Sequence, residues 1–507
     1  MFGENAAKMQ RGTVDRISEL PEFILHTILS MLDTREACRA SVLSKRWYGA
    51  WCSVPVLDFR PRYFVKYGNC PYKYDDNTVE CFVEFVNKTM RRYFTRKYRI
   101  TKMYLELPKV DEKLEPLVDK WIMIAVQNQI QELGIDIVNG IDYKLPEILF
   151  SAKSLKVLIC GNVGLSYYET MDLISLEYLA VAFGDNVDED MLQRMISSCP
   201  LVVFDIKYET CIKNISIPWV KTRGNGTMQS NLQELSLRKL VYFDVGDQSP
   251  WPWNMNVVAL KNLRELVFDC VSITDDIVSE LSNGLVALES LVLSQCIMLE
   301  RVNISSNSLK QLQITNCMWL KKARIDTPNL LELSCCCGVV TSLSLIRVFD
   351  HCNAKFFILD LYSVTTALLS KLKKILVQTN FKSLVIEFDT TPEIEFEEEQ
   401  LKNVGTAAAP YKLRELKLRG TNTRTLPKST FVTFLNGLFW CCRPDVLSVT
   451  TNLEDSPAKL ILSILKEKAQ YWKDPLKSFE VESIEYPRLL SDSSELEIRL
   501  RLSWQSY

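Results

Sequence analysis

Residues 288–296, LESLVLSQC, and residues 309–317, LKQLQITNC, carry one pattern twice, 21 residues apart. Leucine or isoleucine fills the first, fourth and sixth positions of each segment, and a cysteine closes it. The alternation of apolar and polar residues predicts a short strand that buries one face. The two segments therefore predict a structure built from stacked repeats.

Looser copies of the pattern extend the repeat in both directions. Between residues 155 and 330 they begin 21 to 31 residues apart, close to the period of leucine-rich repeats. Each repeat needs neighbours to cover its leucines, so the pattern predicts a solenoid with a parallel concave sheet and helices or irregular turns outside. Residues 121–133 are expected to form one such outer helix. The remaining copies begin at Ile100, Ile130, Ala354, Phe381, Leu413 and Leu476.

The front of the chain has a different organisation. Residues 20–32, LPEFILHTILSML, have apolar side chains at helical spacing, and Asp33 and Ser44 are suited to cap two further short helices. The third helix would carry Trp47 and Trp51 on one face. Three helices in fewer than 45 residues cannot bury this much apolar surface among themselves. Either a partner covers the surplus, or the helices cap the domain that follows.

This front segment resembles the F-box of plant F-box/LRR proteins. The matching features are DRISELP at residues 15–21, SVLSKRW at residues 41–47 and LDF at residues 57–59. The resemblance implies that the helices bind a Skp-type adaptor, which links to a cullin. Carried onto this sequence, the implied adaptor contacts are Leu20, Pro21, Ile24, Ile28, Leu29, Leu32, Val42 and Trp47.

The resemblance continues into the repeats, through residues 118–137 and 145–160, and weakens after about residue 340. We expect a mixed α/β chain: a small three-helix F-box followed by a leucine-rich-repeat solenoid with a parallel concave sheet. The expected division is an F-box at 14–60, a helical linker at 61–99, the solenoid at 100–440 and a C-terminal repeat or capping segment at 441–507. The basic residues 90–99, MRRYFTRKYR, form either a nuclear-import or phosphate-contacting patch or a helix face that joins the modules.

The polar side chains between the strand leucines are expected to cover the concave face. An extended polar surface suits a protein or peptide target, although the same side chains could be plain solvated strand surface. The candidate target contacts are Arg238, Asp269, Gln311, Gln313, Glu332, Lys417 and Arg419.

Catalytic and metal-binding patterns are not found in the sequence. The chain has only two histidines, His26 in the first helix, where it is expected to face solvent, and His351 beside Cys352. Phosphate-binding loops are absent, and the cysteine runs at 335–337 and 441–442 lack the paired spacing of zinc sites. We therefore expect no enzyme activity, no cofactor and no metal. Cys296 and Cys317 are expected to hold backbone groups inside the repeats.

The composition indicates which partners are not expected. Hydrophobic residues make up 47% of the 507 residues, and the net charge of −2 gives no general attraction to nucleic acid or anionic membrane. The first residues lack the apolar stretch of a signal peptide, and the 16 cysteines are spread thinly. These features predict a protein of the nucleus or cytoplasm with reduced thiols, and neither nucleic acid nor membrane is an expected partner.

The favoured function is a substrate-recruiting subunit of a Skp–cullin–F-box ubiquitin ligase. In this hypothesis the front helices bind the adaptor and the solenoid binds an unknown target protein. Two alternatives stay open: a small-molecule receptor of the same architecture, and a repeat scaffold that joins no cullin complex. A hydrolase or transferase is the least supported.

Overall fold

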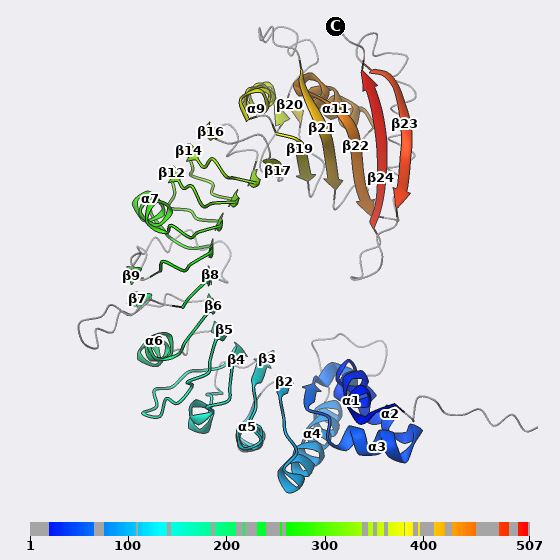
Figure 1. Cartoon of the computed structure of the whole chain (residues 1–507), viewed down its shortest axis with the longest axis vertical. Coiled ribbons are helices and arrows are strands. Elements are labelled where there is room, and N and C mark those ends of the chain that lie inside the picture. The colour runs from blue at the N-terminus through cyan, green and yellow to red at the C-terminus, as the bar shows by residue number, and fades with distance from the viewer. Residues whose placement is uncertain are drawn as a thin grey trace, which may run out of the picture. The chain divides into compact units, whose positions relative to one another are not determined.

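The computed structural model describes residues 20–64, 76–107, 110–138, 143–183, 188–208, 216–217, 231–239, 254–255, 260–336, 343–347, 352–358, 364–379, 381–388, 394–395, 410–420, 428–452, 476–485 and 495–504. The chain divides into two compact units, residues 1–215 and 216–507. The boundary falls inside the region expected to form one solenoid. Figure 1 shows the elements of both units.

Three short helices and a 3-10 turn open the first unit: α1 (Glu22–Ser30), α2 (Thr34–Ala40), η1 (Ser41–Leu43) and α3 (Lys45–Cys52). The predicted caps are confirmed. The Asp33 carboxylate accepts the N–H of Glu36 at 2.8 Å, and the Ser44 hydroxyl accepts that of Trp47 at 3.3 Å. The small core contains Leu25, Leu29, Ala37, Trp47, Ala50 and Trp51.

The strand β1 (Val56–Phe59) ties this helical segment to the repeats. It pairs in parallel with β2 (Lys102–Leu107), the first repeat strand, and the N–H of Asp58 donates to the hydroxyl of Thr34 in α2 at 2.7 Å. The segment that resembles an F-box therefore ends inside the repeat sheet. Its orientation relative to the first repeats is fixed by a strand ladder.

The long helix α4 (Asp76–Arg96) makes a second connection, after the short turn η2 (Pro61–Phe64). The hydroxyl of Tyr93 donates to the carbonyl of Val54 at 2.5 Å, and the guanidinium of Arg92 lies 3.8 Å from the ring centroid of Trp51. Met90 and Tyr93 are buried while Arg91 is exposed. The basic residues at 90–99 therefore include a helix face that joins the modules, one of the two sequence hypotheses for them.

The first unit continues as a parallel sheet of six strands, with the repeat leucines inside. β1 and β2 are followed by β3 to β6, each in register with its neighbour. α5 confirms the outer helix predicted from residue 121, although it begins earlier. The bounds are β3 (Glu132–Ile137), β4 (Val157–Gly161), β5 (Tyr178–Phe183), β6 (Val203–Tyr208), α5 (Glu115–Gln127), η3 (Glu147–Ser151) and α6 (Glu189–Ser198).

A glycine on β3 makes room for an aromatic ring on β2. A Cβ atom on Gly134 would lie 2.5 Å from Cδ2 of Tyr104, and the guanidinium of Arg60 covers the same ring at 4.3 Å from its centroid. Arg60 in turn is ion-paired with Asp58 at 2.7 Å. We expect Gly134→Ala to lower the free energy of unfolding by about 1–3 kcal/mol, because the ring must shift and the pair with it.

Urea denaturation would measure this change, with Gly49→Ala as the matched control. Nothing lies within 4 Å of a Cβ atom built on Gly49, which is exposed in α3. Alanine is the better helix former, so this variant should gain about 0.5–1 kcal/mol. If Gly134→Ala stabilised the protein as much as Gly49→Ala does, the ring of Tyr104 would move without a cost in free energy, and the prediction would be wrong.

The main sheet of the second unit is parallel over nine strands and then changes direction. The parallel strands are β8 (Glu234–Lys239), β10 (Glu265–Asp269), β11 (Ser290–Ser294), β13 (Gln311–Thr315), β15 (Glu332–Cys336), β17 (Asn353–Ile358), β19 (Ser383–Phe388), β21 (Tyr411–Gly420) and β22 (Cys442–Asn452). The leucine-rich-repeat solenoid predicted from sequence is thereby confirmed.

The last two strands of this sheet correct one sequence expectation. β24 (Glu495–Trp504) pairs antiparallel with β22, and β23 (Leu476–Glu485) pairs antiparallel with β24. The repeat copy at Leu476 is therefore wrong, because a further repeat would add a parallel strand. A capping role for residues 441–507 stays a prediction.

A second correction concerns the weak copy at Ala354. β17 places Ala354 opposite Leu333, and Phe356 opposite Cys335. Ala354 thus aligns with the fourth position of the repeat pattern, whereas the sequence analysis had assigned it the first. The pattern was misplaced by three residues because an alanine replaces the strand's leading leucine.

The outer side of the second unit carries a sheet that the sequence analysis did not predict. β12 (Arg301–Ser305), β14 (Lys322–Asp326) and β16 (Leu343–Arg347) pair in parallel on the side away from the main sheet (Figure 1). The repeats that begin at residues 288 and 309 are only 21 residues long, which favours a strand over a helix as the return segment. The preceding, longer repeat has α7 (Asp275–Gly284) there. The remaining described elements are α9 (Thr366–Thr379), α11 (Lys428–Cys441), β7 (Ser216–Ile217), β9 (Asn254–Met255), β18 (Val364–Thr365) and β20 (Ile394–Glu395).

Several repeats end their inner strand with the same backbone turn. The residue after the strand has a φ between 52° and 56° in four of them: Asn162, Cys270, Gln295 and Asn316. This left-handed conformation is uncommon outside glycine and turns the chain away from the sheet. The repeat cysteine, Cys296 or Cys317, follows two of these residues. Its thiol then reaches carbonyls inside the coil.

Candidate functional site

The three front helices present a large apolar surface to solvent. The exposed side chains come from the start and end of α1, from η1 and from α3. Val42 is 84% exposed and Met31 is 79% exposed, which is far from the core positions that these residue types usually take. We call this set the F-box surface; its members are Phe23, Met31, Leu32, Val42, Leu43 and Tyr48.

The adaptor contacts implied by sequence fall into three classes of exposure. Pro21, Leu32 and Val42 are exposed, and Leu20, Ile24 and Ile28 are half-buried. Leu29 and Trp47 are buried, at 1% and 4% exposed, in contact with the other front helices. These two residues can stabilise the helices that carry the F-box surface, but they cannot contact a partner directly. The contacts themselves stay predictions.

Four members of the F-box surface were missed as contacts: Phe23, Met31, Leu43 and Tyr48. No signal in the sequence separated them from the buried residues. Leu25 and Leu29 mark the buried face of α1, and Phe23 and Met31 lie eight residues apart on another face. A helical pattern in which nearly every position is apolar hides which face is inside. His26, expected to face solvent, is half-buried, and its Nε2 lies 3.1 Å from the hydroxyl of Ser53.

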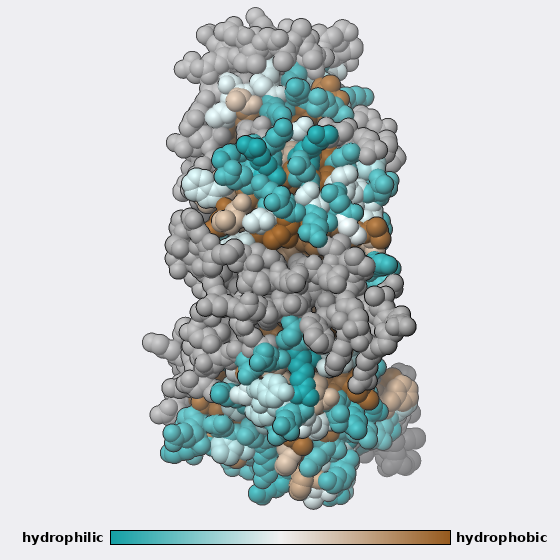
Figure 2. Space-filling view, turned by 90° about the vertical axis from the view of Figure 1, so that its left-hand side faces the viewer, coloured by the Kyte–Doolittle hydropathy of each residue, from teal (hydrophilic) through white to brown (hydrophobic). Residues whose placement is uncertain are grey.

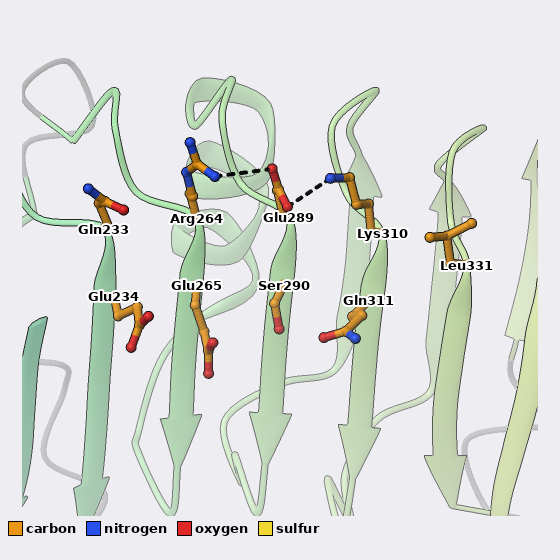
Figure 3. A pocket seen from close by; sticks show the side chains of 9 residues that line it. All are labelled: Gln233, Glu234, Arg264, Glu265, Glu289, Ser290, Lys310, Gln311 and Leu331. Carbon is orange, nitrogen blue, oxygen red and sulfur yellow. Dashed lines mark hydrogen bonds and ion pairs between the residues drawn. The ribbon is translucent and has the colours of Figure 1, made fainter.

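A second candidate site lies where the inner strands of the second unit begin. Figure 3 shows two rows of side chains around a pocket of about 260 Å³. The row that precedes the strands contains Gln233, Arg264, Glu289, Lys310 and Leu331. The first strand row contains Glu234, Glu265, Ser290 and Gln311. The pocket is partly open, is lined by eight polar or charged residues and Leu331, and spans five consecutive repeats.

Charges in this pocket are divided unevenly. The Glu289 carboxylate forms ion pairs with both cations of the pocket, Lys310 at 2.8 Å and Arg264 at 3.9 Å. The hydrogen bond that Lys310 donates lowers the pKa of Glu289. Glu234 and Glu265 are opposite each other on β8 and β10. Among the described residues neither forms an ion pair. This end of the pocket is therefore acidic.

The candidate target contacts all lie on the main sheet of the second unit, on the face away from the leucines. Gln311 lines the pocket, and Glu332 is its register partner on β15. Arg238 and Asp269 are opposite each other at the far ends of β8 and β10. Gln313 donates to the hydroxyl of Thr315 at 3.4 Å.

Lys417 and Arg419 are separated from the other candidates by β17 and β19. Both are ion-paired, Lys417 with Glu415 at 3.6 Å and Arg419 with Glu387 at 3.3 Å. The structure therefore does not gather the seven candidates into one site. The four residues at 233, 264, 289 and 310 were missed because only positions within the strands were considered, although the residue after each first leucine also projects outward.

Two family models match this chain in the regions just described. The F-box domain matches residues 17–59, and the leucine-rich repeats of the FBD-associated F-box protein At5g56370 match residues 218–349. In both regions the chain is similar to plant F-box/LRR-repeat proteins. Among curated relatives from Arabidopsis thaliana, F-box/FBD/LRR-repeat protein At2g26030 is 30% identical over 195 residues, which is 37% of this chain and 40% of that protein.

Other F-box/LRR relatives match to a similar extent. F-box/FBD/LRR-repeat protein At5g56420 of Arabidopsis thaliana is 28% identical over 224 residues, 41% of this chain and 48% of the relative. F-box/LRR-repeat protein 13, from the same plant, is 27% identical over 194 residues, 37% of this chain and 40% of the relative. The matched part thus spans less than half the length of these relatives.

F-box/LRR proteins are generally non-catalytic subunits, and two of the described cysteines of this chain have structural surroundings. The thiol of Cys296 donates to the carbonyls of Ser294 at 3.3 Å and Phe268 at 3.7 Å, and that of Cys317 donates to Thr315 at 3.5 Å and Leu293 at 3.7 Å. The expected role of both cysteines inside the repeats is confirmed. No cluster of metal-binding side chains occurs within the described ranges, and His351 lies outside them. None of the helices that the structure describes is both long and apolar enough to cross a bilayer.

Burial should make the Cys160 thiol unreactive in the folded protein. It raises the pKa of the Cys160 thiol to about 12, whereas Cys81 is exposed on α4. Iodoacetamide at pH 8 should modify Cys81 and leave Cys160 unmodified until denaturant is added, because the thiolate is the reactive form. Peptide mass mapping measures this. Modification of both thiols at equal rates in the native protein would contradict the structure.

The same shift predicts how stability depends on pH. The folded Cys160 thiol keeps its proton up to about pH 12, while the unfolded thiol ionises near pH 9. The folded state therefore binds its proton more tightly. This contribution to stability is complete below pH 9 and is lost as the pH rises toward 12.

Proposed function

We propose that this F-box protein is a substrate-recruiting subunit of a Skp–cullin–F-box ubiquitin ligase. The F-box surface would bind a Skp-type adaptor, and the solenoid would bind a target protein. The protein would contribute proximity, since a target held near the ubiquitin carrier reacts at a raised effective concentration. A location in the nucleus or cytoplasm, where such complexes act, is part of the proposal.

One observation carries the adaptor part of the proposal. Six large apolar side chains are exposed within residues 23–48, although the same helices already have a closed core. An exposed apolar patch of this kind marks an interaction site. The alternative, in which these helices merely cap the repeats, is less favoured. The connection to the repeats is made instead by β1 and by Arg92 and Tyr93 of α4, and it leaves the F-box surface open.

The target part is supported by the polar pocket at the strand starts (Figure 3). Its rims are charged, it crosses several repeats, and its partly open form suits a peptide segment better than an enclosed small molecule. A receptor for a small anionic ligand would need unpaired cations there. Arg264 and Lys310 are both engaged by Glu289 instead.

Co-elution tests the proposal directly. The full chain is mixed with a purified Skp-type adaptor and passed over a size-exclusion column. We expect an equimolar complex that also retains the N-terminal part of a cullin when this is added. An adaptor that elutes alone at micromolar concentrations of both proteins would refute the ligase function and leave the repeat scaffold as the better account.

A further inference from the structure

Among the outer-sheet residues whose side chains the structure describes, three cations are exposed: Arg301, Lys322 and Arg324. Arg301 on β12 is directly opposite Lys322 on β14, and Arg324 lies two residues further along β14 on the same face. Within the described part of the chain, none of the three forms an ion pair. Like charges opposite each other on neighbouring strands destabilise a sheet, so this arrangement favours an anionic partner.

Two of the carboxylates near these cations, Glu300 and Asp275, are engaged elsewhere; a third, Asp326, lies two residues after Arg324 on the same face of β14. Glu300, one residue before Arg301, is ion-paired with Lys321 at 2.9 Å. The two carboxylate oxygens of Asp275 accept the backbone N–H groups of Glu300 and Arg301, each at 2.9 Å. These contacts organise the edge of the outer sheet and leave its positive charge in place.

Apolar side chains border the cations. The turn from β13 to β14 exposes Met318 and Trp319, at 56% and 61%, and Trp319 is three residues before Lys322. The equivalent turn of the preceding repeat carries another apolar pair, Ile297 and Met298, which is half-buried. A tryptophan beside arginines is the composition in which binding energy concentrates at protein interfaces.

Figure 2 views the molecule from the side on which α7, β12 and β14 lie in Figure 1. Strongly hydrophilic surface gathers on this side over the second unit. The main-sheet strands of that unit, which form the pocket of Figure 3, lie on the other side of the outer sheet. A partner bound here would leave the proposed target site free.

We propose that this outer patch, formed by Arg301, Met318, Trp319, Lys322 and Arg324, docks an acidic protein segment that carries an apolar side chain. The apolar group would pack on Trp319 and Met318, and carboxylates would pair with the guanidinium and ammonium groups. Nucleic acid is disfavoured because a protein that binds it with strong salt dependence makes about 6–10 phosphate contacts, two to three times what three cations offer. A membrane surface is disfavoured because stable anchoring takes a larger apolar area than one turn provides. The proposal does not depend on the ligase function.

A short polyglutamate peptide with one central phenylalanine and a fluorescent label serves as the probe, with fluorescence anisotropy as the readout on the full chain. We expect saturable binding that weakens as salt rises. Lys322→Glu/Arg324→Glu should weaken it by about tenfold or more, and Trp319→Ala by about fivefold. Lys374→Glu, an exposed charge reversal on α9, is the matched control and should leave binding unchanged.

Three results would overturn the proposal: no saturable binding, equal affinity for the variants and the unaltered chain, or tighter binding to a polylysine peptide. Tighter patch-dependent binding to phosphatidylserine vesicles or to single-stranded RNA would also overturn it in favour of those partners. The patch residues are exposed, so the variants should keep the fold. Circular dichroism and thermal unfolding check this.

Discussion

Replacing Val42 and Leu43 together by aspartate is expected to weaken binding of a Skp-type adaptor by about 100-fold or more. Both side chains are exposed in η1, at 84% and 64%. A carboxylate without a partner in a closed interface costs about 3–5 kcal/mol. Each 1.4 kcal/mol changes affinity about tenfold. Isothermal titration calorimetry with the purified adaptor measures the loss.

Exposure makes this variant more informative than a change in α1. A charge at Leu29, which is 1% exposed, would unfold the helices and abolish binding for a trivial reason. Val42→Asp/Leu43→Asp should leave the free energy of unfolding within about 0.5 kcal/mol. Val286→Asp, exposed at 71% in the second unit, is the control and should bind normally. Adaptor affinity that survives in the double variant would show that the F-box surface is not the docking surface.

The second large effect is expected at Tyr93. This side chain is fully buried between the front helices and the repeats, and its hydroxyl donates to the carbonyl of Val54. Tyr93→Ala should lower the free energy of unfolding by about 3–5 kcal/mol, the range for removing a buried aromatic ring. Tyr93→Phe keeps the ring but leaves the carbonyl unpaired, and should cost about 1–3 kcal/mol. Urea unfolding followed by tryptophan fluorescence measures both.

The adjacent residue supplies the comparison for Tyr93. Phe94 is exposed on the same helix, so Phe94→Ala should cost less than about 1 kcal/mol. If the two alanine variants were equally stable, α4 would not be the element that joins the front helices to the repeats. A separate early transition that appears in Tyr93→Ala would locate the weakened region, because Trp47 and Trp51 report on the front helices.

The sequence was most informative where one pattern repeats. Leucines at fixed spacing predicted the parallel inner sheet, and Asp33 and Ser44 predicted the ends of two helices, because each of these signals is local. Which apolar side chains of the front helices are buried was harder to predict from the sequence. Leu25 and Phe23 are both apolar and two residues apart, yet one is buried and the other exposed, and only the packing of α1 on α3 decides which.

Long-range pairing explains the other errors. Nothing within Leu476–Glu485 distinguishes a parallel from an antiparallel strand, since both alternate apolar and polar residues. The prediction of the candidate target site was limited for the same reason, because it depends on which strands are neighbours. The row at Arg264, Glu289 and Lys310 becomes visible only once neighbouring strands are in register, and Arg238 and Arg419 prove to be several strands apart.

The strand β1 has a consequence for how such proteins diversify. Because β1 is the first strand of a parallel ladder, an inserted or deleted repeat in the first unit would lengthen or shorten that ladder by one interstrand spacing, about 4.8 Å, and would leave the front helices unaltered. Under the proposed ligase function, duplication of a single repeat would therefore change the separation between the adaptor-binding helices and the later strands of that unit in fixed steps.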